Sequence, residues 1–158
     1  MIRREVTEEA SSEAERPDLA AMMVRLGRAL TAAELPVLRA HGLSMWAYVV
    51  LLALDEVPVR SQSALAEAIH ADKTRIIGVL DDLQERGLIR RSPDPSDRRV
   101  RLLSLTPEGR RLRDEAQAGI RQREARLLDH LPPAERATFL QVLRDLHDRP
   151  WQDLTGEA

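Results

Sequence analysis

The stretch from Arg86 to Thr106, RGLIRRSPDPSDRRVRLLSLT, carries the strongest indication of the fold. Gly87 stands where a helix commonly ends in a left-handed residue, and two apolar runs follow on either side of a polar loop. That loop contains Asp97, Arg98 and Arg99, and its two prolines are expected to stiffen it. An arginine side chain fits phosphate oxygens, guanine edges or a narrow minor groove. We therefore expect a β-hairpin that holds two arginines at its tip for contact with nucleic acid.

Two short helices are predicted immediately before this hairpin. Ser61 is a candidate N-cap for a helix over residues 62–69, and Asp72 caps a helix that runs to Arg86. The second helix has an apolar inner face made by Ile76, Val79, Leu80 and Leu83. Two helices joined by a tight turn form a helix-turn-helix.

Longer helices are expected on both sides of this unit. An apolar stripe at helical spacing follows Pro17 and ends near Gly42, and residues 45–54 are apolar on almost all sides. The sequence Thr106-Pro107-Glu108 is a strong helix start, because it places a cap, a first-position proline and an acid in order. The helix that begins there is predicted to reach about His130, and a last helix covers residues 134–147. Because nothing within the chain obliges the first and last helices to meet, we favour a homodimer over an intrachain bundle.

The composition and the distribution of charge indicate the class of protein and the kind of partner. The 158 residues are 43% hydrophobic, 32% charged and 3% aromatic, with a formal net charge of -2, which is typical of a helix-rich protein. Nine arginines lie between Arg86 and Arg113 against three acids, so the charge is distributed unevenly. This basic band fits either a polyanion contact or a solvated arginine-rich face.

The sequence also argues against several classes of protein. The absence of cysteine excludes disulfides, thiolate metal sites and thiol-based redox sensing. No apolar run has the length of a membrane span and the first residues lack a signal peptide, so we expect a cytoplasmic protein without a membrane partner. The four histidines show no paired spacing, and nucleophile elbows, phosphate-binding glycine loops and zinc-binding helix motifs are missing. We therefore expect no metal, no cofactor and no enzymatic activity.

The segment from Ser63 to Leu112, SALAEAIHADKTRIIGVLDDLQERGLIRRSPDPSDRRVRLLSLTPEGRRL, resembles the MarR family of winged helix-turn-helix transcriptional regulators. The resemblance implies a mainly α fold with a small β-hairpin wing, in which a winged helix-turn-helix is joined to a helical dimerisation lobe. Residues 1–16 are charged and lack periodicity, so we expect a mobile arm there. By the likeness residues 17–56 and 107–158 form the dimerisation lobe, and residues 57–106 form the DNA-binding lobe. The chain would then act as a homodimeric, sequence-specific regulator, and most simply a repressor, on a pseudo-palindromic stretch of double-stranded DNA.

The resemblance places a set of DNA contacts on the helix-turn-helix and the wing. The helix that begins at Asp72 would enter the major groove, Arg99 would reach the minor groove with Asp97 bracing it, and Arg98 would meet phosphate. The expected DNA-binding residues are Ser61, Gln62, Ser63, Lys73, Thr74, Arg75, Ile77, Arg86, Arg90, Asp97, Arg98 and Arg99, with Arg91 as a further phosphate contact.

Several of these residues have a structural alternative. Ser61 can serve as a helix cap, and Arg86 can pair with Asp82 across one helical turn. Gly78 departs from the family pattern, because many relatives carry a polar or basic residue there; it either permits close approach to DNA or removes one base contact. A winged helix used only for protein interaction would share the fold without needing Lys73, Arg75, Arg98 and Arg99 on one surface.

The resemblance also implies a small aromatic or phenolic effector that releases the DNA. His41, Trp46 and Tyr48 lie near the place where such a pocket is expected. Packing at a helix junction explains each of the three equally well. The sequence does not identify the effector.

Overall fold

The computed structural model describes residues 17–56, 61–97 and 100–150. These residues form six helices and one antiparallel pair of strands, which confirms the predicted mainly α fold with a small hairpin. In chain order the elements are α2 (Leu19–Ala40), α3 (Met45–Glu56), α4 (Gln62–Ala68), α5 (Lys73–Glu85), β1 (Ile89–Pro93), β2 (Arg101–Leu105), α6 (Pro107–Leu128) and α7 (Pro133–His147).

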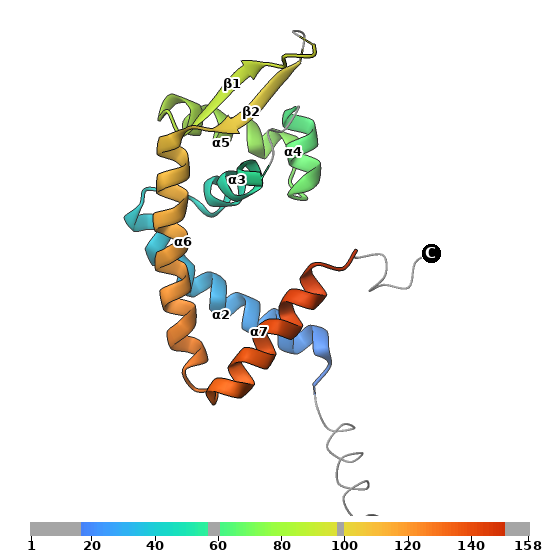
Figure 1. The fold of residues 1–158 in the computed structure, drawn as a ribbon, viewed down its shortest axis with the longest axis vertical. Helices are drawn as coiled ribbons and strands as arrows, with labels where there is room; N and C mark the ends of the chain where they lie inside the picture. The colour runs from blue at the N-terminus through green and yellow to red at the C-terminus, as the bar shows by residue number, and fades with distance from the viewer. Residues whose placement is uncertain (1–16, 57–60, 98–99, 151–158) are drawn as a thin grey trace, which may run out of the picture.

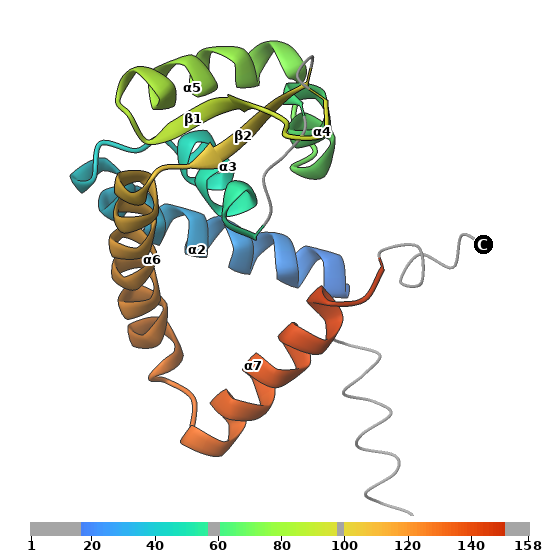
Figure 2. The ribbon, with the colours of Figure 1, turned by 45° about the horizontal axis from the view of Figure 1, so that its top comes forward.

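The elements divide into a compact lobe and a set of long helices. Helix α3 packs against both α5 and β2, β1 lies beside α5, α4 lies next to α3 and α5, and α6 leads away from the end of β2 (Figures 1 and 2). Helix α2 crosses α6, and α7 turns back from the far end of α6 toward α2. The long helices therefore carry the compact lobe at one end.

The hydrophobic core fills the compact lobe and its junction with α2 and α6. Large residues with almost no exposed surface come from α2, α3, α4, α5 and both strands: Leu38, Val50, Leu51, Leu65, Ile76, Leu80, Leu83, Ile89 and Leu103. The predicted inner face of α5 is confirmed, since Ile76, Leu80 and Leu83 are buried and Val79 packs against the core. Helix α7 contributes no buried residue, so the core of one chain does not include it.

Helices α2, α4 and α5 end in the same way. Each is followed by a residue in the left-handed region, namely Gly42 (φ 64°), His70 (φ 50°) and Gly87 (φ 69°). In each case the N–H of the next residue donates a hydrogen bond to a carbonyl in the last turn of the helix. The three bonds run from Leu43 to Leu38, from Ala71 to Ala66 and from Leu88 to Leu83. This is the Schellman motif, and it satisfies carbonyls that the helix leaves without partners. The predicted stops at Gly42 and Gly87 are confirmed.

The strands differ slightly from residues 88–91 and 99–105, the two runs that the sequence predicts as strands. Strand β1 begins at Ile89 because the Leu88 N–H completes the end of α5, and it extends to Pro93, which pairs with Arg101. Pro93 is tolerated there because it is the last residue of the strand, where a missing donor costs little. Pro36 lies inside α2, which continues to Ala40, so this proline does not end the helix.

A tight junction joins the hairpin to α6. The Thr106 side chain caps α6 by accepting from Gly109 N at 3.0 Å, and its Oγ1 lies 2.7 Å from the Gly87 carbonyl oxygen. The Thr106 N–H donates to the Leu88 carbonyl at 3.1 Å. A Cβ atom at Gly109 would lie 1.9 Å from that same carbonyl oxygen. Only glycine fits at this position.

We expect Gly109→Ala to destabilise the protein, because the methyl group would collide with backbone that cannot move without disturbing α5, β1 and α6. Overpacking of this kind costs about 1–3 kcal/mol, occasionally more. Gly78→Ala is the matched control, since a Cβ there meets nothing within 4 Å and the helix propensity of alanine favours it by up to about 1 kcal/mol. Thermal unfolding at equal protein concentration should show a lower Tm for the first variant and an unchanged or higher Tm for the second. Equal Tm values for both would contradict the close approach at Gly109.

Candidate nucleic-acid interface

The turn between α4 and α5 is built by the residues that the sequence indicated. Ser61 caps α4 by accepting from Ala64 N at 3.0 Å. Asp72 caps α5 by accepting from Thr74 N at 2.8 Å and more distantly from Arg75 N. The hydrogen bond from the Thr74 backbone is the main reason that the pKa of Asp72 is lowered. This carboxylate is thus engaged in capping the helix.

The first two turns of α5 present a mixed polar and apolar outer face. Thr74, Arg75 and Gly78 are exposed, and Ile77 keeps 46% of its surface exposed although it is a large apolar residue. The side chain of Lys73 lies outside the described part of the structure. An exposed isoleucine between hydrogen-bonding residues is suited to a thymine methyl group in the major groove.

Farther along α5 two exposed aspartates are paired with arginines. Arg91 of β1 lies 2.9 Å from Asp81. Arg86 lies 3.1 Å from Asp82 and donates at 3.0 Å to the Gly42 carbonyl. The structure therefore favours the alternative in which Arg86 pairs with Asp82. Because these ion pairs occupy the second half of α5, its first half is the part open for base contacts.

A hollow of about 530 Å³ separates the start of α4 from the hairpin. It is lined by Ser61, Gln62, Ser63, Arg91, Val100, Arg101 and Leu103. The predicted phosphate-binding residues of α4 thus face two arginines of the hairpin. Arg101 was missed by the sequence analysis, although its place at the start of β2 after an arginine pair was a usable signal.

The wing loop is organised by an aspartate that the sequence analysis counted only as a charge. Asp94 is 5% exposed, and its Oδ1 accepts from Ser96 N at 2.7 Å and from Ser96 Oγ at 2.6 Å. The Asp97 carbonyl accepts from Val100 N at 2.9 Å. The Asp-Pro-Ser sequence is a typical signal for such a side-chain turn. Arg98 and Arg99, which were predicted to touch DNA, lie outside the described residues.

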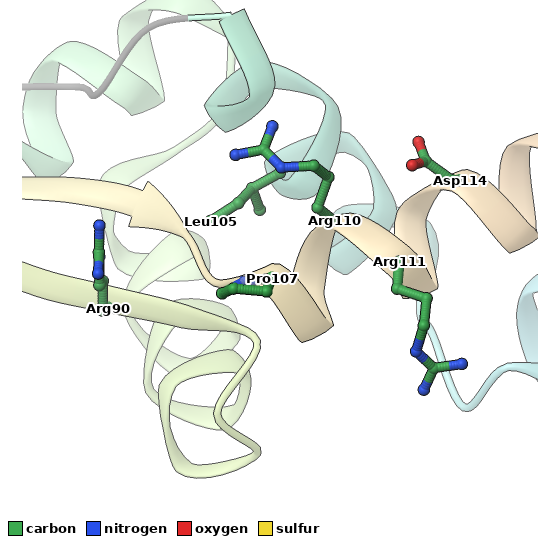
Figure 3. A pocket seen from close by; sticks show the side chains of 6 residues that line it. All are labelled: Arg90, Leu105, Pro107, Arg110, Arg111 and Asp114. Carbon is green, nitrogen blue, oxygen red and sulfur yellow. The ribbon is translucent and has the colours of Figure 1, made fainter.

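A second hollow, of about 450 Å³, lies where Arg90 of the hairpin approaches the start of α6. Arg90, Arg110 and Arg111 line it, but Arg110 and Arg111 point to opposite sides of α6 (Figure 3). Arg111 is held by Glu108 and Glu115, and Arg90 Nε donates to Ser104 Oγ at 3.2 Å. Since the guanidinium groups do not converge, this hollow lacks the arrangement of an anion site. Arg90 lines this hollow, whereas Arg91 lines the one beside α4.

The three residues predicted near an effector make separate contacts in the structure. His41 lies with Nδ1 2.9 Å from the Val37 carbonyl of its own helix. Trp46 lies beneath the guanidinium of Arg75, which is 5.5 Å from the ring centroid. Tyr48 is buried two residues farther along α3, and residues at that spacing point to different sides of a helix.

Tyr48 belongs instead to a polar cluster where α2, α3 and α6 meet. Burial, followed by the charge of Glu34, raises the pKa of the Tyr48 phenol, whereas Arg121 and a hydrogen bond with Gln117 lower it. Burial and the nearby Glu124 raise the pKa of Glu34. The cluster therefore combines a protonated phenol, two carboxylates and a guanidinium in a partly desolvated junction. Sequence reasoning found only Tyr48 of this set, because the others lie far apart in the chain.

Comparison with known proteins identifies the class. The model of the MarR family matches residues 43–100. The chain is 35% identical over 101 residues to the transcriptional repressor NicR of Pseudomonas putida, an alignment that spans 64% of each protein. Among solved structures, CouR of Rhodococcus jostii bound to p-coumaroyl-CoA is 31% identical with a TM-score of 0.65, covering 84% of this chain and 94% of that one.

A second solved structure is matched over the whole of its own chain. The MarR family protein Rv2887 of Mycobacterium tuberculosis, in complex with p-aminosalicylic acid, is 26% identical with a TM-score of 0.72, covering 84% of this chain and all of the relative. The protein described here belongs to the MarR family of winged helix-turn-helix transcriptional regulators. Membership in this family of regulators confirms the expectation that it is not an enzyme.

Two further observations concern membranes and metals. In the part of the chain that is described, no single helix is long and apolar enough to span a membrane. One pair of helices, Leu19–Ala40 and Met45–Leu54, is long and apolar enough only when taken together, and the two are bent by 86° relative to each other. Among those same residues, no group of three or more histidine and acidic side chains could hold a metal ion.

The raised pKa of Glu34 predicts a pH-dependent effect on stability. An acid whose pKa is raised in the folded state favours folding at low pH, and this contribution is lost as the pH rises through its folded-state pKa. We expect Glu34→Gln to raise the Tm at pH 7.5, because burial and Glu124 disfavour the charged form of Glu34, and to lose this advantage below the ordinary pKa of glutamate. Differential scanning calorimetry at both pH values measures the effect, with exposed Glu67→Gln as control. A pH-independent difference would contradict the assignment.

Proposed function

We propose that this protein is a sequence-specific DNA-binding repressor. The observation that carries the proposal is the joint surface formed by the first half of α5 and the hollow beside it. Thr74, Arg75 and Ile77 offer hydrogen bonds and an apolar contact for base edges, while Arg91 and Arg101 flank the hydroxyl residues of α4 that suit phosphate. NicR is named a repressor, and CouR has been solved as a repressor bound to a 23-mer DNA duplex, which supports the same role here.

The proposed active form is a homodimer. Leu19, Val24, Leu140, Val142 and Leu146 are exposed on α2 and α7. An apolar groove of about 500 Å³ lies between α2, α7 and the end of α6. Because α7 has no fully buried residue within its own chain, contact with an outside partner would stabilise it. A second copy of the chain is that partner, and its two-fold symmetry would match a pseudo-palindromic operator.

We further propose that a small aromatic acid releases the operator. Rv2887 has been solved with salicylic acid and CouR with p-coumaroyl-CoA. In this chain the cluster around Tyr48 offers a phenol donor and the Arg121 guanidinium, which can hydrogen-bond a carboxylate, while the raised pKa of Glu34 reduces the opposing negative charge. The cluster joins helices of the long-helix region to α3 of the compact lobe, so a ligand there can favour one spacing of the DNA-binding lobes over another.

A gel shift with the DNA that flanks the protein's own gene tests the function. The proposal predicts a retarded band that survives an excess of unrelated duplex at physiological salt. A winged helix that serves only protein interaction would give no such band, and this outcome would refute sequence-specific binding.

Arg99→Ala is expected to weaken operator binding by roughly 5- to 150-fold without lowering the Tm. The family likeness places Arg99 in the minor groove, and loss of one such contact is worth about 1–3 kcal/mol, or a factor of roughly 5 to 150. Equilibrium anisotropy titrations at fixed salt measure the affinity, with Arg126→Ala on the exposed far end of α6 as the control. Equal affinities for the two variants would rule out the predicted role.

Leu140→Asp is expected to produce monomers, because it places a charge in the apolar groove. Gln141→Glu is the control, since Gln141 is exposed and does not line the groove. Size-exclusion chromatography with light scattering should report half the wild-type mass for the first variant only, together with weaker operator binding. A variant Leu140→Asp that keeps the wild-type mass would contradict the proposed interface.

Tyr48→Phe is expected to reduce release by the effector while leaving operator affinity without ligand unchanged. Salicylate, p-coumarate and 6-hydroxynicotinate serve as probes in anisotropy titrations of the wild type and the variant. We expect at least one probe to weaken wild-type DNA binding, and the variant to require a higher concentration of it. A probe that acts equally on both proteins would exclude Tyr48 from the site, and failure of all three would count against an aromatic acid effector.

A further inference from the structure

The contact between Trp46 and Arg75 joins two residues that the sequence assigned to different tasks. Trp46 lies in the first turn of α3 and is half-buried, whereas Arg75 lies in the first turn of α5 and is exposed. The guanidinium carbon is 5.5 Å from the centroid of the indole ring, over its face. This distance is within the range of a cation–π interaction.

Both ends of the contact are carried on firmly held backbone. Ser44 caps α3 by accepting from Ala47 N at 3.1 Å, and Leu43 and Ala47 on either side of the tryptophan are buried. At the other end, the Asp72 carboxylate caps α5 by accepting hydrogen bonds from the backbone N–H groups of Thr74 and Arg75. The ring therefore occupies a fixed place relative to the helix that carries Arg75.

The geometry of the contact leaves Arg75 able to bind another group. A cation–π interaction uses the flat face of the guanidinium, while its N–H donors point outward in the plane of the group. Those donors are the ones that form a paired contact with the O6 and N7 atoms of guanine. Stacking on Trp46 thus restricts the rotamers of a long side chain without consuming its donors, so less conformational freedom is lost when DNA binds.

We propose that Trp46 is a positioning residue for DNA recognition, which holds Arg75 in the orientation that contacts a base. The inference rests on the proposed function and adds to it a determinant of specificity that lies outside the helix-turn-helix. It also gives Trp46 a role different from the effector contact that the sequence indicated. A purely space-filling role would require only an apolar side chain of suitable size, whereas this role requires the negative face of the ring.

A double-mutant cycle separates positioning from packing. Trp46→Leu should weaken binding to the operator duplex by about 3- to 10-fold, which corresponds to ordering one long side chain. In an Arg75→Ala background the same substitution should have no effect on affinity, because the residue that Trp46 positions is gone. Base preference, measured with duplexes that carry single substitutions, should relax at the same positions in Trp46→Leu and in Arg75→Ala. An equal loss in both backgrounds, or unchanged base preference, would overturn the proposal.

A second variant preserves the shape of the core in case Trp46→Leu lowers the Tm. Trp151 is the only other tryptophan in the chain, so Trp151→Phe leaves a single site at which a fluorinated tryptophan can be incorporated. Fluorination weakens the negative face of the ring and hardly alters its size. We expect it to weaken operator binding by about 2- to 5-fold when Arg75 is present and not at all in Arg75→Ala. Unchanged binding when Arg75 is present would overturn the proposal, whereas a wild-type protein that binds no operator would refute the proposed function itself.

Discussion

The close approach of α6 to the end of α5 is the constraint on which the arrangement of this molecule depends. Gly109 lies against the Leu88 carbonyl so tightly that a Cβ atom would fall 1.9 Å from its oxygen. Thr106 stabilises the same junction, because it caps α6 and hydrogen-bonds to the peptide groups that follow α5. The end of the recognition helix, the start of the hairpin and the start of the long helix therefore meet within a few residues. A change in the direction of α6 must consequently move α5 and the hairpin together.

This junction explains how a surface that reads DNA can respond to events elsewhere in the molecule. Helix α6 carries Gln117, Arg121 and Glu124 of the polar cluster around Tyr48, and its far end lines the apolar groove that we assign to a second copy of the chain. A ligand at the cluster or a shift between the two copies would therefore act on one rigid element. The Trp46–Arg75 contact adds a second connection, because α3 carries both Trp46 and Tyr48.

Local features of the fold were predictable from the sequence, and contacts between distant elements were not. Ser61, Asp72 and Thr106 cap the helices they were expected to cap, and Gly42 and Gly87 end helices as expected, because each signal depends on a few neighbouring residues. The placement of Arg75 over Trp46 and the carboxylates beside Tyr48 depend on how helices pack, for which the sequence has no local signal. Asp94 was overlooked for a different reason. The Asp-Pro-Ser sequence was a sufficient signal for its turn, but the residue was considered only as a charge opposing the arginines.

We propose that two copies of this chain read DNA with the first half of α5 in the major groove and the wing beside it. Hydroxyl-radical footprinting on the DNA that flanks the gene measures this arrangement. We expect two protected half-sites on one face of the duplex, with centres separated by a whole number of helical turns of about 10 base pairs. A single protected half-site at saturating protein, or protection no stronger than on unrelated DNA, would contradict it.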